Sequence, residues 1–372
     1  MTAPITIYRA KQIVTMNPSN PAATHVAVRD GQILGAGTLA ELKGWGKYEL
    51  DDSFQHHVLT PGFVEAHAHV TEGAFAVLPY MGYFDRLQVD GSIAKGIKNY
   101  DELIAALKKL DSAMTDPNAV LAVQGFDPIY FKGERLNRHH LDRVSTTRPI
   151  YVVHASGHLA TANTALLKAS NITRATTTPG VGKDDDGEPD GELQELPAMA
   201  LAGEALKQLM AVMAGDQGIW NFGMLARNAG ITTVTDLAGS TIFQPDSLAI
   251  WQKIVNDPKF PARVAIYNTA ALPGAEADFG AVAAKTRDLQ ANTASDKLRF
   301  PGVKFVIDGS IQGWTAVLNE PGYYTGEDNG LLLTVPEQFK EWLRPFHEAG
   351  INVHVHCNGD KTADVFIEAV EQ

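Results

Sequence analysis

Two histidines, His67 and His69, stand two residues apart directly after the run TPGFVEA. Alternate side chains of a β-strand project to the same face, so both imidazoles are expected to point the same way. Two neutral imidazoles at this spacing can bind one divalent cation, and the alternative is a pair of histidines hydrogen-bonded in a polar cleft. Strand ends carry the ligand sites of α/β barrels and open α/β sheets. The pair is therefore a candidate metal site.

A second pair, His354 and His356, stands at the end of another strand-like run. Its presence favours the metal interpretation, although a packed or hydrogen-bonded barrel residue stays open for His354. Cys357 follows directly. Neighbouring residues of a strand face opposite ways, so a Cys/His dyad is excluded there and the cysteine is predicted to be structural.

Lys304 lies inside the apolar run PGVKFVIDGS. A lysine is rarely buried without a partner, so its position asks for one. Two interpretations stay open. Carbamylation by carbon dioxide would turn the cation into a carboxylate able to bridge two metal ions, and a salt bridge to Asp308 or Asp236 would make the residue structural.

The elements that would position these residues are of two kinds. Residues 1–59 consist of short runs in which apolar and polar positions alternate, with the hairpin signal Asp30-Gly31 between two of them. This pattern predicts a small antiparallel sheet. From Thr60 onward, strand-like runs alternate with amphipathic helices, which indicates βαβ units and a parallel sheet, in a barrel or a doubly wound fold. The expected strands are 231–236, 262–270, 303–310 and 351–360, and the expected helices are 219–229, 247–255 and 337–348.

A stretch from about residue 80 to residue 218 interrupts this alternation. It contains two expected helices, 100–114 and 193–213, and two strand-like runs, VLAVQGF and IYVVHAS. Its charged segment GKDDDGEPDGE lacks the spacing of a calcium loop and is predicted to be a solvated turn.

The formal net charge of −12, from 31 Lys and Arg against 43 Asp and Glu, argues against a nucleic-acid partner. A single cysteine excludes an intrachain disulfide. The opening MTAPITIYRAK has no apolar signal segment, and no apolar run approaches the roughly 20 residues that span a bilayer. We therefore expect a cytoplasmic protein with a small-molecule substrate and no membrane partner, and a homodimer stays open.

The segment TPGFVEAHAHV resembles the first-strand signature of the amidohydrolase superfamily. VKFVIDGSIQGWTAVLNEPGYYTG and HVHCNGDKTADVFIEAV are similar to the fourth- and fifth-strand segments of its YtcJ-like branch, amidohydrolase family 3, and GFDPIYFKGERLNRHHLDRVSTTRPIYVVHASGHLATANTALL resembles the insertion after its first strand. The resemblance implies an α/β fold: a TIM-like (β/α) barrel over residues 60–372, an insertion at about 80–218 between barrel strands 1 and 2, and a small β-sandwich domain to which residues 1–59 belong.

The resemblance also implies roles for single residues. His67 and His69 match the first-strand metal ligands, Lys304 matches a fourth-strand lysine ligand that is commonly carbamylated, and His356 matches the fifth-strand histidine ligand. One or two divalent ions are implied, zinc first, with iron and manganese also compatible with these donors. The implied substrate contacts are His158 in the insertion, Asp308 and Trp314.

In the family the barrel continues with a sixth-strand histidine and an eighth-strand aspartate that acts as general base. This chain stops at FIEAVEQ, in the helix expected after the fifth strand. We therefore expect an incomplete barrel, a catalytic base beyond the chain end, and little hydrolysis by this chain alone.

The implied function is hydrolysis of a C–N, amide-like bond by metal-activated water. An isomerase, a lyase or a hydrolase acting on another bond stays open, because one barrel hosts many chemistries. A catalytically impaired metal-binding or regulatory relative also stays open. A nucleotide-binding protein is disfavoured, because the chain has no GxGxxG between a strand and a helix and no GxxxxGK[ST].

Overall fold

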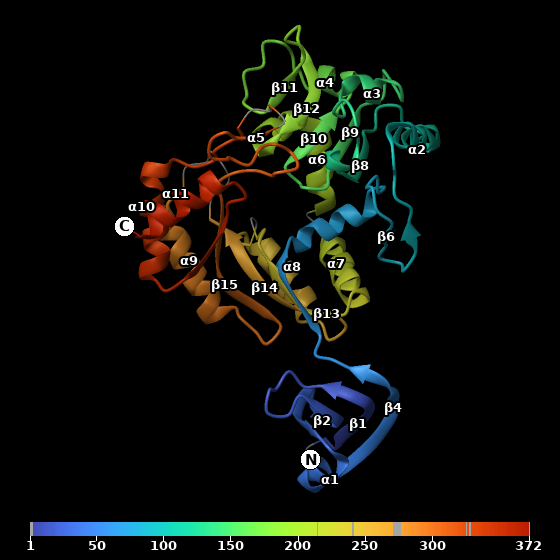
Figure 1. The fold of residues 1–372 in the computed structure, drawn as a ribbon, viewed down its shortest axis with the longest axis vertical. Coiled ribbons are helices and arrows are strands. Elements are labelled where there is room, and N and C mark those ends of the chain that lie inside the picture. The colour runs from blue at the N-terminus through green and yellow to red at the C-terminus, as the bar shows by residue number, and fades with distance from the viewer. Residues whose placement is uncertain are drawn as a thin grey trace. The chain divides into compact units, whose positions relative to one another are not determined.

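The computed structural model describes residues 3–213, 215–239, 242–270, 277–324, 326 and 329–371 (Figure 1). The chain divides into two compact units, Met1–Phe63 and Val64–Gln372. In the part of the chain that the structure describes, no helix is long and apolar enough to cross a membrane.

The first unit is one four-stranded sheet in the order β3-β2-β1-β4. The elements are β1 (Ile5–Val14), β2 (Ala22–Arg29), β3 (Gln32–Gly37), α1 (Leu39–Leu42), η1 (Lys43–Trp45) and β4 (Tyr48–Leu59). Asp30 and Gly31 join β2 to β3 with φ values of 52° and 73°, the left-handed pair that a tight two-residue hairpin turn requires. The hairpin prediction is confirmed.

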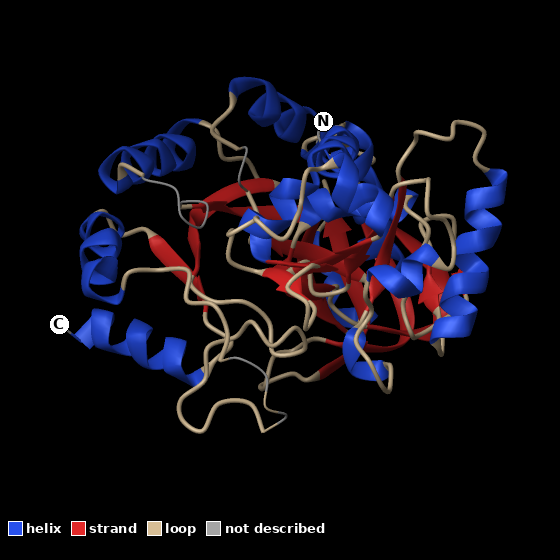
Figure 2. Cartoon of the chain, turned by 90° about the horizontal axis from the view of Figure 1, so that it is seen from above, coloured by secondary structure: helices blue, strands red, loops and turns tan. Residues whose placement is uncertain are grey.

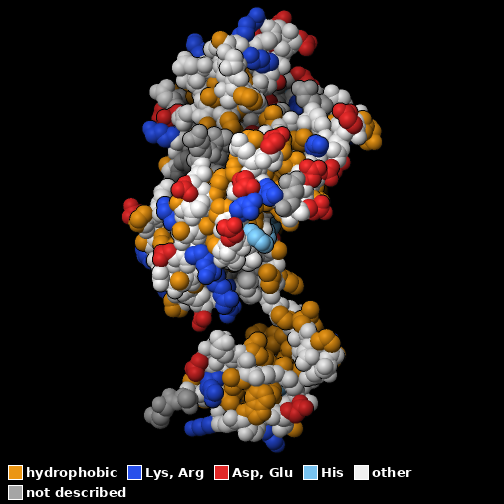
Figure 3. Space-filling view, turned by 90° about the vertical axis from the view of Figure 1, so that its left-hand side faces the viewer, with side chains coloured by type: hydrophobic (Ala, Val, Ile, Leu, Met, Phe, Trp, Pro, Cys, Tyr) orange, Lys and Arg blue, Asp and Glu red, His pale blue; other side chains and the backbone are white. Residues whose placement is uncertain are grey.

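The expectation of a wholly antiparallel sheet is wrong, because β4 pairs with β1 in parallel. The connection from β3 runs through α1 and η1, which gives the chain the length to return to the same end of the sheet. One sheet is found among the described residues of this unit, so the β-sandwich stays a prediction. Strand β4 exposes Leu50, Phe54 and Val58, and Figure 3 shows apolar side chains at the surface of this unit.

The second unit contains a curled five-stranded sheet whose spatial order, β5-β13-β14-β15-β16, is also the chain order. Its strands are β5 (Phe63–Ala68), β13 (Ile231–Asp236), β14 (Arg263–Thr269), β15 (Leu298–Val306) and β16 (Asn352–His356), and the last four pair in parallel. A doubly wound sheet would reverse its order at a switch point, so this order is that of a barrel.

Helices cover the outer side of this sheet (Figure 2). They are α7 (Asp216–Asn228), α8 (Pro245–Val255), α9 (Phe279–Asn292), α10 (Pro336–Glu348) and α11 (Asp360–Glu371). Val303 and Phe305 of β15 pack outward against Phe339 and Phe346 of α10 in one hydrophobic cluster. Lys304, between them, therefore projects to the opposite, inner face of the sheet.

The stretch between β5 and β13 forms its own five-stranded sheet, in the order β11-β12-β10-β9-β8. Its strands are β8 (Leu121–Phe126), β9 (Ile150–His154), β10 (Leu159–Ala162), β11 (Val181–Lys183) and β12 (Pro189–Gln194), and the short strands β6 (Arg86–Leu87) and β7 (Ile93–Ala94) pair separately. The helices are η2 (Val70–Val77), α2 (Tyr100–Ala113), η3 (Pro128–Tyr130), α3 (Arg138–Asp142), α4 (Thr164–Ala169), α5 (Glu195–Met199), η4 (Ala200–Ala202) and α6 (Gly203–Met213).

The expected single helix over 193–213 is wrong. Its first residues belong to β12, which pairs with β10 and β11, and the helical part is divided among α5, η4 and α6. The break has a local cause, because Gly203 has φ 3° and ψ −76°, outside the helical region. The charged segment forms a turn between β11 and β12, as predicted. Within it, Asp184 accepts a hydrogen bond from the Glu188 amide and pairs with Arg138.

Candidate functional site

His67 and His69 stand at the end of β5 with ring centroids 5.4 Å apart. The pKa of His67 is lowered to about 4, mainly because the ring has lost solvent. The positive charges of Lys304, His69 and His356 contribute smaller amounts to this shift. These groups therefore lie close enough to His67 to affect it. A neutral imidazole keeps a lone pair, which is the form that binds a metal.

Lys304 is 3% exposed on the inner face of β15, beside His354 in the strand register. No hydrogen bond or ion pair joins its Nζ to another residue in the described ranges, so neither Asp308 nor Asp236 forms the expected salt bridge. Burial lowers the pKa of Lys304 to about 8. The structural alternative thus lacks its expected partners, and the buried amine has no counter-charge among the described residues.

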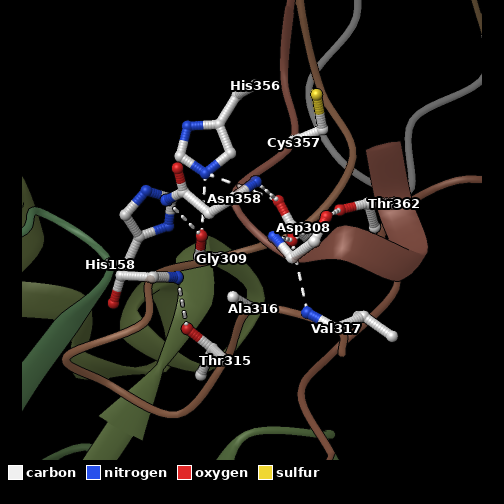
Figure 4. A network of polar contacts seen from close by, with 12 residues as sticks. His158, Asp308, Gly309, Thr315, Ala316, Val317, His356, Cys357, Asn358 and Thr362 are labelled. Atoms are coloured by element: carbon white, nitrogen blue, oxygen red, sulfur yellow. Dashed lines mark hydrogen bonds and ion pairs between the residues drawn. The ribbon is translucent and has the colours of Figure 1, made fainter. Parts of the chain in front are cut away.

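His356 ends the neighbouring strand and shares this inner face. Its Nε2 lies 2.8 Å from the Gly309 carbonyl oxygen, which can only accept, so Nε2 carries the hydrogen (Figure 4). Burial lowers the pKa of His356, which favours the neutral ring with its lone pair on Nδ1. His354 has another environment, with its ring edge-on to Tyr267 at 4.4 Å, which agrees with a packed barrel residue.

Asp308 is completely buried beneath this strand end. Its carboxylate accepts hydrogen bonds from the backbone amides of Asn358, Gly359 and Val317 and from the Thr362 hydroxyl, at 2.8 to 3.2 Å (Figure 4). These bonds join the loop after β15 to the start of α11. The expected substrate contact stays a prediction, while the contacts favour a positioning role.

His158, from the insertion, reaches the same place. Its ring centroid lies 4.9 Å from that of His356, and its Nδ1 lies 2.8 Å from Oε2 of Glu195. Glu195 is 4% exposed and has a left-handed φ of 62°, and its Oε1 has no hydrogen-bond partner in the described structure. Glu195 was not among the site residues predicted from the sequence. Strained backbone of this kind gathers at functional sites.

Trp314 follows β15 and also has a left-handed φ, of 59°. The Arg135 guanidinium lies over its ring at 4.1 Å and pairs with Glu192 through two hydrogen bonds. The indole thus packs against the insertion. Its expected substrate contact stays a prediction.

A cavity of about 360 Å³ opens beside His69, between the first barrel strand and the insertion. Its lining residues come from η2, β8, β9, α7 and the segment around β6. They are His69, Gly73, Phe75, Tyr80, Arg86, Gln124, Gly125, Val153, His154, Ala155, Gly157, Phe222 and Leu225. Its volume suits a small molecule.

The residue types at this site suit a divalent cation, but their side chains are not arranged around a single point. In the described ranges, no group of three or more His, Cys, Asp or Glu side chains is arranged to hold a metal ion. His67 and His69 form a pair, and Lys304 is a buried amine without an anionic partner among the described residues. His356 donates its Nε2–H to the Gly309 carbonyl oxygen. Carbamylation of Lys304 would supply the oxygen ligands that the pair lacks.

Comparisons with known proteins place the chain in a family. It is 25% identical over 369 residues to the protein LONG AFTER FAR-RED 3 of Arabidopsis thaliana, covering 96% of this chain and 60% of that protein. It is 26% identical over 389 residues to YtcJ of Bacillus subtilis, covering 98% of this chain and 66% of YtcJ. The chain thus spans less than two thirds of the length of each.

Among solved structures, an uncharacterized metal-dependent hydrolase from Pyrococcus horikoshii aligns with a TM-score of 0.64 at 18% identity, covering 99% of this chain and 68% of that one. This likeness confirms the barrel architecture. The model of the amidohydrolase family matches residues 56–372. The chain therefore belongs to the amidohydrolase family, as its histidine, lysine and strand-end motifs indicated.

Proposed function

We propose that this chain carries the site of a metal-dependent hydrolase that cleaves a C–N, amide-like bond in a small molecule. The observation that carries the proposal is the burial of the Lys304 amine without an ion pair in the described ranges. A buried amine without a counter-charge destabilises the fold unless another interaction compensates, and conversion to a metal-bound carbamate would provide one.

The residues that would hold the metal are His67, His69, carbamylated Lys304 and His356. His356 would offer Nδ1, since Gly309 engages its Nε2–H. Imidazole and carboxylate donors suit zinc first, and iron or manganese as alternatives. When bound, such an ion lowers the pKa of a water ligand and polarises a carbonyl group.

Carbamylation of Lys304 requires the neutral amine, whose lone pair attacks the carbon of CO₂ and whose proton leaves to solvent. A pKa of about 8 places a larger fraction of the amine in this form near neutral pH than an ordinary lysine has. The inner face of the sheet thus favours the modification chemically.

The pair of His158 and Glu195 would position the site. The carboxylate accepts from Nδ1–H of His158, which fixes the ring orientation and leaves the lone pair on Nε2. Asp308 would hold the loop that bears Gly309, and through it His356. Neither residue needs to touch a substrate for these effects.

The test is elemental analysis of the purified protein with two double variants. About one or two equivalents of zinc, iron or manganese are expected in the wild type, and they should be lost when His67 and His69 are both changed to alanine. The matched control changes His56 and His57, two exposed histidines of β4, to alanine and should keep the metal.

A second measurement uses ¹³C-labelled bicarbonate. A protein carbamate signal is expected in the ¹³C NMR spectrum of the wild type and not in Lys304→Met. Absence of metal from a folded wild type would reject the metal-dependent hydrolase and favour a regulatory relative. Turnover of a substrate without release of an amine or ammonia would reject the assigned bond.

A further inference from the structure

The cavity beside His69 has walls of two kinds. Phe75, Tyr80 and Phe222 line it with aromatic surface, which suits an apolar group. Among the lining residues that the structure describes, Arg86 is the only lysine, arginine, aspartate or glutamate. The lining therefore combines an apolar surface with a single positive charge.

In the described structure, one hydrogen bond and one ring contact hold the Arg86 guanidinium. Its Nη1 donates to Oε1 of the buried Gln124 at 3.2 Å, and its Cζ lies 5.4 Å from the centre of the Tyr80 ring. No ion pair of Arg86 is found in the described part of the chain, and the adjacent Asp85 pairs with Lys95 at 2.6 Å instead. The charge is thus held at the cavity without being neutralised.

The lining also contains a polar atom without a hydrogen-bond partner in the described structure. His154 is 3% exposed, and its Nε2 lies 2.9 Å from the Thr161 hydroxyl, while Nδ1 has no hydrogen-bond partner in the described structure. Burial lowers the pKa of His154 to about 3, so the ring is neutral at physiological pH. A buried polar atom left unpaired is unfavourable, and a polar group of a bound molecule could satisfy it.

We propose that this cavity takes the apolar part of the substrate and that Arg86 selects substrates bearing a carboxylate. This inference rests on the proposed function only in calling the bound molecule a substrate, because binding of a carboxylate does not require hydrolysis. A guanidinium binds a carboxylate through paired, charge-assisted hydrogen bonds. One arginine in an aromatic pocket matches a monoanion, whereas a phosphate dianion would call for more donors. The ligand class is therefore a small apolar carboxylate.

The test is calorimetric titration of the purified protein, with its bound metal, using phenylacetate and its neutral isostere phenylacetamide. Phenylacetate is expected to bind about tenfold more tightly, in line with a charge-assisted pair. Arg86→Gln should abolish this preference, and Arg86→Lys should keep part of it. The matched control is Arg143→Gln, which removes an exposed arginine paired with Asp101 outside the cavity and should keep the full preference.

Equal binding of the two probes, or no binding of either, would overturn the inference. A preference that survives in Arg86→Gln would overturn it as well, since the carboxylate would then bind elsewhere, for example at a metal ion. Metal content and thermal unfolding of each variant show that the site and the fold are intact. An Arg86-dependent preference in a folded protein that binds no metal would refute the proposed function and leave this inference standing.

Discussion

Lys304 and Asp308 are two buried charged residues four positions apart, and their surroundings are opposite. Asp308 is completely buried and receives four hydrogen bonds from protein groups. Lys304 is 3% exposed and has no hydrogen bond or ion pair in the described ranges. A charge that the fold fully satisfies serves the fold, whereas a buried charge that the fold leaves unsatisfied is a candidate for chemistry.

The largest change in the free energy of unfolding is expected for Asp308, the residue whose charge the fold satisfies with hydrogen bonds. Asp308→Ala leaves the backbone amides of Asn358, Gly359 and Val317 without their acceptor, and should lower the free energy of unfolding by about 4 kcal/mol. Chemical denaturation measures this change. The control Asp364→Ala removes an exposed carboxylate whose one hydrogen bond in the described structure comes from the Asn319 side chain, and should cost well under 1 kcal/mol. Similar losses in both variants would refute the distinction.

The next effect has the opposite sign. In the metal-free protein, Lys304→Met removes a desolvated ammonium and should raise the free energy of unfolding by about 2 kcal/mol near pH 7. Burial lowers the folded pKa to about 8, so the unfolded chain binds more protons between that value and the ordinary lysine pKa. The wild type therefore regains stability as pH rises through this window, and the difference should shrink. A destabilised Lys304→Met would mean that the lysine has a structural partner.

His154 lies between these cases, with one ring nitrogen paired and the other not. Its folded pKa of about 3 lies below that of the unfolded chain, so stability falls as pH decreases from about 6.5. In His154→Gln, the loss of unfolding free energy between about pH 7.5 and pH 5.5 should be smaller by about 1 kcal/mol. Denaturation curves at the two pH values measure it. An unchanged loss would mean that the ring is not buried in its neutral form.

Much of the fold could be predicted because its periodicity is local. The runs at 231–236 and 262–270 are apolar and β-branched, and both became strands of the parallel sheet. The parallel pairing of β4 with β1 could not be predicted, because it depends on where the connection through α1 leads the chain. The prediction of one helix over 193–213 was wrong for a related reason. Most of the segment is helical, but its first residues pair with β10 and β11 as part of β12.

The site divides in the same way. Histidines two residues apart are visible in any strand-like run, so His67 and His69 could be found from the sequence. Glu195 could not, because its pairing with His158 depends on a left-handed residue at the start of α5. The sequence also could not show whether Lys304 has a partner. Asp308 is close enough in the chain to be one, but in the folded loop its carboxylate bonds to the Gly359 amide and the Thr362 hydroxyl instead.

The position of the insertion has a consequence for the order of folding. Strands β5 and β13 are neighbours in the sheet, yet about 160 residues separate them in the chain. Closing an unstructured loop of that length would cost roughly 4 to 5 kcal/mol in chain entropy. The insertion's sheet forms through far shorter connections, as between β9 and β10, and once formed it shortens the effective loop. Folding should therefore start in the insertion, and His67 and His69, at and just after the end of β5, should join Lys304 only in a late step.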